Sequence, residues 1–418
     1  VFVDEIAGSA AVAIETRELI ESQQALLEGI IRLVANAIDA KSPYTGGHCD
    51  RVPKLAQMMV DEAIQSPAEP FANFTMNDDE RYEFHLAAWL HDCGKITSPE
   101  HVVDKAVKLE TIYNRIHEIR TRFEVLHRDA EIRCLKRQLA GESSQQSETD
   151  RDLEQEELQK AFRAVANANT GGEFMSENDI EHIRQIGQRT WVRHFSDRLG
   201  LSGDEKQVLT DTPEQALPAT EPLLADKPSH LRSWGEHKPP VTKDDPRNLW
   251  GFDMTLPEHA VNQGELHNLT VAKGTLTPEE RFRINDHIVQ TICMLDALPL
   301  PDRLANVPPL AGTHHERMDG RGYPEQLAEW QISRFARLVS IVDAYDAITS
   351  DRCYRDGLPA SEAIRILFRN RGQQFDTTMV EAFIRMIGVY PPGSLVELST
   401  GEVAIVVATH PGRKLKPR

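Results

Sequence analysis

Cysteine, long apolar runs and positive charge are all scarce in this chain of 418 residues. Its five cysteines are widely spaced and never form a CxxC pair, which argues against a disulfide framework or a zinc ribbon and favours a reducing cytosol. No run approaches the roughly 18 consecutive apolar residues of a membrane helix. The net charge of −18 argues against a basic surface that binds nucleic-acid polymers.

The composition is otherwise that of an ordinary globular protein, with 40% hydrophobic and 27% charged residues. Its length suits one large domain or two to three modest ones. An anionic substrate would need local positive charge in a chain this acidic, supplied by metals or by a few placed basic residues. The 16 histidines therefore direct the search towards metal ligands.

Residues 15–40 are predicted to form one helix, because Leu19, Leu26 and Leu33 recur every seven residues. The stripe indicates either a helix packed on the core or a short parallel coiled coil, which would make a homodimer. Residues 2–19 resemble the closing helix of a GAF-type sensor domain. We therefore expect residues 1–32 to be a linker or signalling helix that follows an upstream sensor domain.

The rest of the chain is predicted to be mainly α-helical with a small β appendage. Residues 141–160 are so polar that they indicate a solvated or disordered excursion. Residues 394–408 alternate and then become β-branched around a Thr-Gly pair, which predicts a β-hairpin. Regular helices are predicted over four further ranges: 277–298, 309–317, 335–349 and 360–387.

The sharpest local feature is the sequence HDCGK, in which His91 and Asp92 are adjacent at the end of a predicted helix. Phe84 and Ala88 precede His91 at helical spacing, so its imidazole shares their apolar face. A lone histidine there would usually be a satisfied core residue. Asp92 changes this interpretation, because a carboxylate in apolar surroundings is costly unless it is paired or binds a metal.

Two further segments concentrate histidine and aspartate. HHERMDGRGYP (314–324) carries consecutive histidines that would point roughly 100° apart on a helix, followed by a glycine turn that can approach a ligand closely. In RLVSIVDAYD (337–346), Asp343 sits among apolar neighbours and Asp346 follows three residues later. The helix surface accommodates one of these acids comfortably, not both, and burial without a partner is costly.

Together these motifs resemble the HD-GYP family, phosphodiesterases of the HD metal-dependent phosphohydrolase superfamily. HHERMDGRGYP matches every fixed position of the family pattern, whereas the HD pair alone is a weak signal. The resemblance covers about residues 30–110 and 266–410. It implies an HD-type helical bundle around a metal centre, in a domain over 33–410 interrupted by an insertion at about 111–265.

The resemblance also implies roles for individual residues. The family's metal ligands match His48, His91, Asp92, His287, His314, His315 and Asp343. Asp92 is expected to bridge two metals, and Lys95 to face the scissile phosphate, so both are expected to act in catalysis. Arg317 and Arg321 are candidates for holding the second phosphate, because a planar guanidinium suits phosphate oxygens. Tyr323 either donates to a phosphate or shapes the loop.

Two divalent cations are expected, because the glutamate that holds a third metal in some family members is Tyr44 here. Mixed histidine and carboxylate ligation suits Fe or Mn better than a thiolate-rich zinc site. A hydroxide that bridges the metals would attack phosphorus, and the metals with Lys95 would take up the charge on the phosphate oxygens.

The resemblance therefore implies hydrolysis of cyclic di-GMP to pGpG and/or GMP in bacterial second-messenger signalling. Two alternatives stay open: a phosphohydrolase of another cyclic nucleotide, such as cyclic GMP-AMP, and a non-catalytic module that senses cyclic di-GMP. The second would be marked by a lost ligand or a lost Lys95, and neither is lost. We expect a cytoplasmic location, either independently or as the cytoplasmic part of a membrane-anchored sensor.

Overall fold

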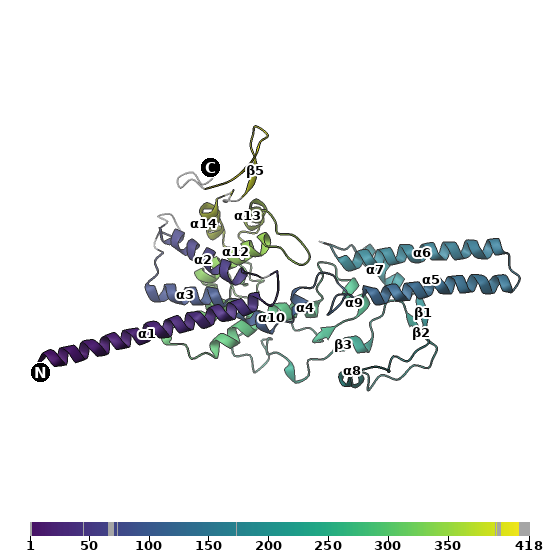
Figure 1. The fold of residues 1–418 in the computed structure, drawn as a ribbon, viewed down its shortest axis with the longest axis horizontal. Helices are drawn as coiled ribbons and strands as arrows, with labels where there is room; N and C mark the ends of the chain where they lie inside the picture. Colours follow the sequence, from purple (N-terminus) through teal and green to yellow (C-terminus); the bar gives the residue numbers. More distant parts are fainter. Residues whose placement is uncertain are drawn as a thin grey trace. The chain divides into compact units, whose positions relative to one another are not determined.

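The computed structural model describes residues 2–44, 46–65, 71–72, 74–172, 174–388, 390 and 394–408. It confirms the mainly α fold class, because the described residues form 14 α-helices and only two-stranded sheets (Figure 1). None of the helices described is long and apolar enough to cross a membrane. The chain divides into two compact units.

Unit 1 comprises Val1–Ser98, Pro240–Met254 and Asn285–Arg418. Its elements are α1 (Phe2–Asp39), α2 (His48–Gln65), α3 (Asp78–Leu90), the 3₁₀ helix η1 (Cys93–Thr97), η4 (Asp302–Leu304), α11 (Val307–Gly312), η5 (Glu329–Gln331), α12 (Arg334–Thr349), α13 (Ala360–Arg369), α14 (Thr377–Ile387), β5 (Leu395–Glu397) and β6 (Val403–Ile405). Helix α10 (Pro278–Asp296) contains the point at which the chain passes from unit 2 to unit 1.

Unit 2 comprises Pro99–Pro239 and Thr255–Ile284. Its elements are α4 (Glu100–Val103), α5 (Ile116–Leu139), α6 (Ser144–Thr170), α7 (Glu177–Gly187), β1 (Thr190–Arg193), α8 (Gly203–Val208), β2 (Ala219–Pro222), η2 (Pro228–His230), β3 (Leu231–Arg232), η3 (Gly235–His237), β4 (Val261–Asn262) and α9 (Glu265–Leu269). Strands β1 and β2 pair antiparallel, as do β3 and β4. The predicted boundaries of the HD-GYP domain and its insertion stay a prediction.

Unit 1 is held together by two apolar cores. In the first, α2 packs against α12 and α14, with Val52, Ile341 and Phe383 fully buried. In the second, the end of α1 packs on α3, where Ile31 and Leu86 are buried. These cores fix α2, α3 and α12, which carry or immediately precede several of the predicted site residues.

Two predictions about local structure need correction. Residues 141–160, predicted to be solvated or disordered, are mostly exposed to solvent but are not disordered, since α6 covers most of them and lies beside α5 (Figure 1). The helix predicted over 309–317 ends at Gly312, so His314 and His315 lie in the turn after α11. A Cβ at Gly312 would lie 2.1 Å from Ile292 Cγ1, so this end of α11 approaches α10 more closely than a side chain would permit.

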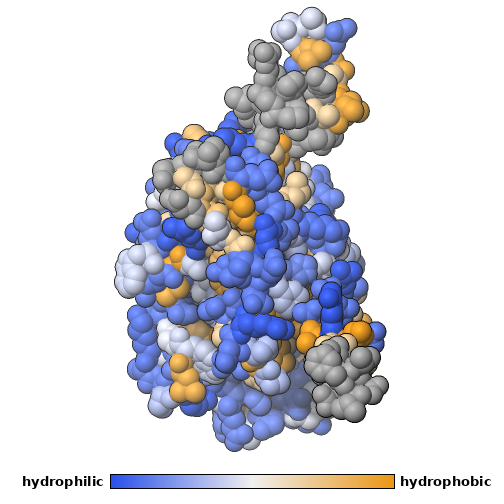
Figure 2. Space-filling view, turned by 90° about the vertical axis from the view of Figure 1, so that its left-hand side faces the viewer, coloured by the Kyte–Doolittle hydropathy of each residue, from blue (hydrophilic) through white to orange (hydrophobic). Residues whose placement is uncertain are grey.

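The other sequence predictions of local structure match the described elements closely. The range 360–387 holds two helices, α13 and α14, and the predicted hairpin is β5–β6, where Leu395 pairs with Ile405. One face of the hairpin is apolar and exposed; Leu395, Val403 and Ile405 lie on it. Figure 2 shows this orange face at the top of the view.

Candidate metal centre

The turn that contains His91 and Asp92, called the HD turn below, owes its position to a glycine. Helix α3 ends at Leu90, and His91 and Asp92 follow it directly. A Cβ at Gly94 would lie 1.9 Å from the carbonyl oxygen of His287. The Gly94 N–H also donates to Thr291 Oγ1 at 2.9 Å. The absence of a side chain at Gly94 therefore lets the HD turn press against α10, the helix that carries His287.

The loop that contains the GYP sequence is shaped by Glu316 and Gly322. The buried carboxylate of Glu316 accepts hydrogen bonds from the backbone N–H groups of Glu325 at 2.7 Å and Leu327 at 2.9 Å. A Cβ at Gly322 would lie 2.4 Å from Glu316 Cα, so the loop can adopt this conformation only with a glycine at position 322. The Tyr323 ring then stacks on His315, with centroids 4.9 Å apart.

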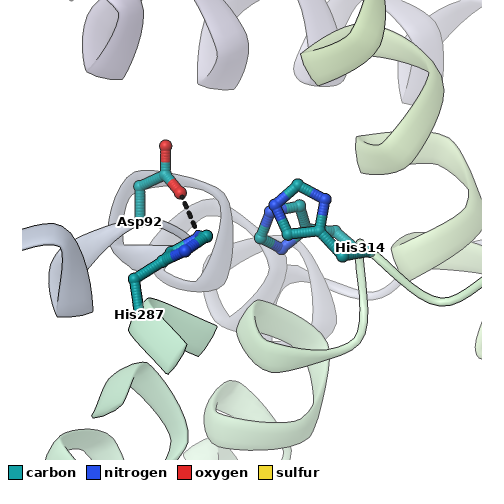
Figure 3. Close-up of side chains that lie close together, drawn as sticks. Asp92, His287 and His314 are labelled. Carbon is teal, nitrogen blue, oxygen red and sulfur yellow. Dashed lines mark ion pairs between the residues drawn. The ribbon is translucent and has the colours of Figure 1, made fainter. Parts of the chain in front are cut away.

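The structure brings all seven predicted ligands into two groups of side chains. Within each group the potential ligand atoms lie within 4.8 Å of one another. One group comprises Asp92, His287, His314 and His315, and the other comprises His48, His91 and Asp343. Figure 3 shows Asp92 beside His287, with His314 close by. The shared location is observed, whereas metal ligation by these residues stays a prediction.

Asp92 connects the two groups. It is 2% exposed. Its Oδ1 lies 3.2 Å from Nε2 of His287, while its Oδ2 lies 3.1 Å from Nε2 of His48 and 3.3 Å from Nε2 of His91. The two carboxylate oxygens therefore face opposite groups, an arrangement that suits a bridge between two cations.

Two histidines are fixed so that Nε2 faces the centre. Nδ1 of His91 lies 2.7 Å from the carbonyl oxygen of Ala88, and Nδ1 of His314 lies 2.7 Å from that of Ala311. Since a carbonyl only accepts, each Nδ1 carries a proton, and the tautomer with this proton has its lone pair on Nε2. Both Nε2 atoms are buried, with no hydrogen-bond partner in the described part of the chain. This donor set fits a divalent cation.

The electrostatics differ among the predicted ligands. Burial would lower the pKa of His48, but its hydrogen bonds with Asp343, Asp346 and Asp92 together outweigh this and raise it to about 10, so this ring has to lose a proton before it can bind a cation. Burial lowers the pKa of His314 to about 4 and holds that of His315 well below its ordinary value, so both rings are neutral at pH 7. Burial would raise the pKa of Asp343, but its hydrogen bond with His48 and the nearby histidine rings together outweigh this and lower it. Neutral imidazoles and ionised carboxylates are the states in which these groups bind metal.

Lys95 lies beside Asp92. Its ammonium group donates to Asp92 Oδ2. Burial would lower the pKa of Lys95, but the charges of Asp92 and Asp343 and the hydrogen bond with Asp92 together outweigh this and raise it, so the side chain is a cation at neutral pH. Lys95 is thus adjacent to the residue that joins the two groups, as expected for a lysine that faces a phosphate.

The predicted substrate-binding residues lie on the loop after the double histidine. Arg317 forms an ion pair with Asp319 at 2.8 Å, and Arg321 is exposed. Tyr323 is half-buried because its ring stacks on His315. These positions place three polar groups on one loop beside the centre, and their contact with a substrate stays a prediction.

Sequence reasoning missed two residues that support the centre. It could place only one of the acids Asp343 and Asp346 comfortably, yet Asp346 is 3% exposed and lies 2.8 Å from Nδ1 of His48. Arg51 pairs with the same carboxylate, with Nη2 2.9 Å from Oδ2. The signal was the spacing: Arg51 follows His48 by three residues, and Asp346 follows Asp343 by three.

One segment of the predicted insertion supports the GYP loop. Residues Pro240–Met254 group with unit 1. The Asp253 N–H donates to the carbonyl of Pro324 at 2.7 Å, and the Gln326 side-chain amide donates to the carbonyl of Asp253 at 2.6 Å. Gln326 has a φ of 55°, so these hydrogen bonds help to hold a strained backbone beside the candidate centre.

Comparison with known proteins gives three findings. A family model described as an HD domain matches residues 218–379. A cyclic di-GMP phosphodiesterase of Pseudomonas aeruginosa is 48% identical over 105 residues, covering 25% of each chain. A 3'3'-cGAMP-specific phosphodiesterase of Vibrio cholerae is 33% identical over 257 residues, covering 55% of this chain and 49% of the relative.

The solved structures include a partial likeness to an HDG"Y"P protein from Bdellovibrio bacteriovorus. That match is 20% identical, covers 27% of this chain and 34% of the other, and has a TM-score of 0.23. Among the curated relatives, the chain spans about a quarter of the Pseudomonas protein and about half of the Vibrio protein.

Proposed function

We propose that this chain, an HD-domain protein of the HD-GYP group, hydrolyses cyclic di-GMP to pGpG and/or GMP. The observation that carries the proposal is the pair of ligand groups that Asp92 connects, with Lys95 beside Asp92. Similarity to relatives named cyclic di-GMP phosphodiesterases supports the choice of substrate. The alternative substrate, 3'3'-cGAMP, is kept for the test because two relatives carry that name.

The residues present fit two divalent cations. His287, His314 and His315 would hold one and His48, His91 and Asp343 the other, with Asp92 between them. When bound, such cations lower the pKa of a coordinated water and act as Lewis acids on a phosphate. We propose Fe or Mn, because the donors are imidazoles and carboxylates and neither ligand group contains a cysteine.

The chain's own residues then bind and orient the phosphodiester. Lys95 brings a positive charge next to Asp92 and would donate to a phosphate oxygen. Arg51 neutralises Asp346, so that acid does not repel the substrate. With two divalent cations, the centre is locally positive although the whole chain carries a charge of −18. An anionic dinucleotide is therefore attracted to the centre.

The test measures bound metal and substrate turnover on the same preparation, made without oxygen and supplied with Fe or Mn. We expect about two metals per chain and release of pGpG or GMP in the wild type. Asp92→Ala should lose turnover and most of the metal. The control is Asp302→Ala, because Asp302 is an exposed acid of unit 1. A substrate panel with 3'3'-cGAMP decides between the two cyclic dinucleotides.

Three outcomes would contradict the proposal. If the metal-supplied wild type binds no metal, the ligand assignment is wrong. If it binds two metals and cleaves no cyclic dinucleotide, the chain is a sensing module or acts on another phosphoester. Equal activity in wild type and Asp92→Ala would also contradict it, since Asp92 contacts both ligand groups.

We further propose a homodimer through α1. Leu19, Leu26 and Leu33 are 60%, 66% and 68% exposed, whereas Ile31 and Ala35 of the same helix are buried in the core. The exposed leucines can thus pack against a second copy of α1, as in a parallel coiled coil. Leu26→Glu should lower self-association in ultracentrifugation while turnover is retained. A wild type that stays monomeric at high concentration would refute the dimer.

We propose a cytoplasmic location, with a sensor domain upstream of α1. The five cysteines, all in the described part of the chain, form no disulfide, which suits a reducing compartment. Fractionation of cells that produce the full-length protein tests the location. Recovery only from an oxidising compartment would refute it.

A further inference from the structure

We propose that Asp346 and Arg51 are positioning residues that orient His48 towards a cation. This inference rests on the proposed metal centre and adds two residues to it. It concerns the His48 side of the centre, where the potential ligand atoms of His48, His91 and Asp343 lie within 4.8 Å of one another.

The orientation of His48 depends on a side chain from another helix. Nδ1 of His48, at the start of α2, lies 2.8 Å from Oδ2 of Asp346 on α12. An ionised carboxylate only accepts, so Nδ1 carries a proton. Nε2 of the same ring lies 3.1 Å from Asp92 Oδ2 and 3.3 Å from Asp343 Oδ1. The Asp346 contact therefore directs Nε2 into the centre.

The position of His48 explains why it requires a carboxylate. His91 and His314 bond through Nδ1 to backbone carbonyls three residues earlier. His48 is the first residue of α2, so no preceding turn of that helix supplies such a carbonyl. Asp346 performs the same task from α12. A carboxylate is the stronger acceptor, and in known metal sites such a partner fixes the tautomer and orientation of a histidine.

Arg51 fixes Asp346 in turn. Its guanidinium donates through Nε to Oδ1 of Asp346 at 2.5 Å and through Nη2 to Oδ2 at 2.9 Å. It also donates to Ser350 Oγ at 3.0 Å and to the carbonyl of Gly46 at 2.9 Å. Arg51 thus ties the residues before His48 to the end of α12. It also balances the charge of a buried carboxylate.

An ion pair that only stabilises the fold could be as buried as Arg51–Asp346, so burial does not identify a positioning role. The test therefore needs a comparable ion pair that does not contact the centre. Arg337 and Asp376 provide one, since Arg337 Nη1 lies 3.0 Å from Asp376 Oδ2 and the pair connects α12 to the start of α14. Within the described residues, no hydrogen bond or ion pair links either side chain to a predicted ligand. Breaking this pair costs stability without touching the centre.

The experiment compares the full chain with Asp346→Leu, Asp346→Asn and Arg337→Met. Equilibrium dialysis against Mn²⁺ gives the number and affinity of bound ions, and thermal unfolding in chelator gives the stability of the metal-free protein. Asp346→Leu should lower the affinity for one of the two Mn²⁺ ions about 10- to 100-fold. Asp346→Asn should be intermediate, because its amide oxygen can still accept from Nδ1. Arg337→Met should keep both affinities.

Four results decide the proposal. If Asp346→Leu binds Mn²⁺ like the wild type, or if Arg337→Met loses as much affinity at equal loss of stability, the positioning role is refuted. If Asp346→Leu does not fold, Arg51→Met replaces it, and an unchanged affinity in that variant refutes the role. A wild type that binds no Mn²⁺ refutes the metal centre itself, which is a distinguishable failure.

Discussion

The contact between the HD turn and α10 makes Gly94 the residue whose side-chain size matters most at the centre. In Gly94→Ala, the new Cβ would lie 1.9 Å from the carbonyl oxygen of His287 and 2.6 Å from the backbone nitrogen of Thr291. Both atoms belong to a helix backbone, which cannot turn aside as a flexible side chain could. The HD turn therefore has to move away from α10.

The cost has two components. Forcing an extra carbon into a packed interior costs about 1–3 kcal/mol. Moving the turn also breaks the hydrogen bond from Gly94 N–H to Thr291 Oγ1, which is worth about 1 kcal/mol. We expect Gly94→Ala to lower the free energy of unfolding of unit 1 by about 2–4 kcal/mol. Because His91 and Asp92 lie on the turn that moves, metal affinity should fall as well.

The assay measures the unfolding midpoint and bound Mn²⁺ on the same samples. Thr291→Val removes the hydrogen-bond acceptor without adding a clash, so it should cost only about 1 kcal/mol. Gly29→Ala is the control, since Gly29 lies inside α1 and no described atom lies within 4 Å of the added carbon. Gly94→Ala with wild-type stability and metal content would refute the reasoning.

Two further predictions test other parts of the chain. In unit 2, burial would raise the pKa of Glu265, but the hydrogen bonds and charge of Arg122 and the hydrogen bond from the Ala225 N–H together outweigh this and lower it. Arg122→Met should therefore lower the free energy of unfolding most at a pH above the unfolded glutamate pKa of about 4.3, and the difference from the wild type should shrink as the pH falls below that value. A difference in the free energy of unfolding that does not depend on pH would contradict this prediction. In unit 1, Glu316→Ala removes the acceptor of the Glu325 and Leu327 N–H groups, so the loop that carries the predicted substrate-binding residues should shift. Turnover should then fall about 100-fold while the metal content stays unchanged. Unchanged turnover would contradict this prediction.

The sequence motifs picked out seven residues that the structure brings together, and their role as metal ligands stays a prediction. The seven residues come from distant parts of the chain, and the structure places their potential ligand atoms in two adjoining groups. The predicted helix over 335–349 coincides with α12, so Asp343 lies on the element expected for it. Local pattern was sufficient wherever an apolar stripe or a motif specified the element.

Local pattern failed where the partner is remote in sequence. Residues 141–160 were predicted to be solvated or disordered because almost none is apolar, yet α6 forms there. Its acids meet basic residues of α5, as in the ion pairs Arg133–Glu154 and Arg137–Asp150. Composition alone could not reveal these partners. The same limit hid Asp346, whose burial is compensated by Arg51 from another helix.

Several independent contacts orient the side chains of the candidate centre. His91 and His314 are oriented by carbonyls of their own chain segments, and His48 by a carboxylate from α12. Asp92 lies on a turn that reaches α10 because Gly94 has no side chain. These hydrogen bonds involve Nδ1 of each ring, not the Nε2 that faces the centre. For His91 and His314 the fold itself therefore favours the tautomer that leaves Nε2 towards a cation, which reduces the reorganisation that metal binding requires.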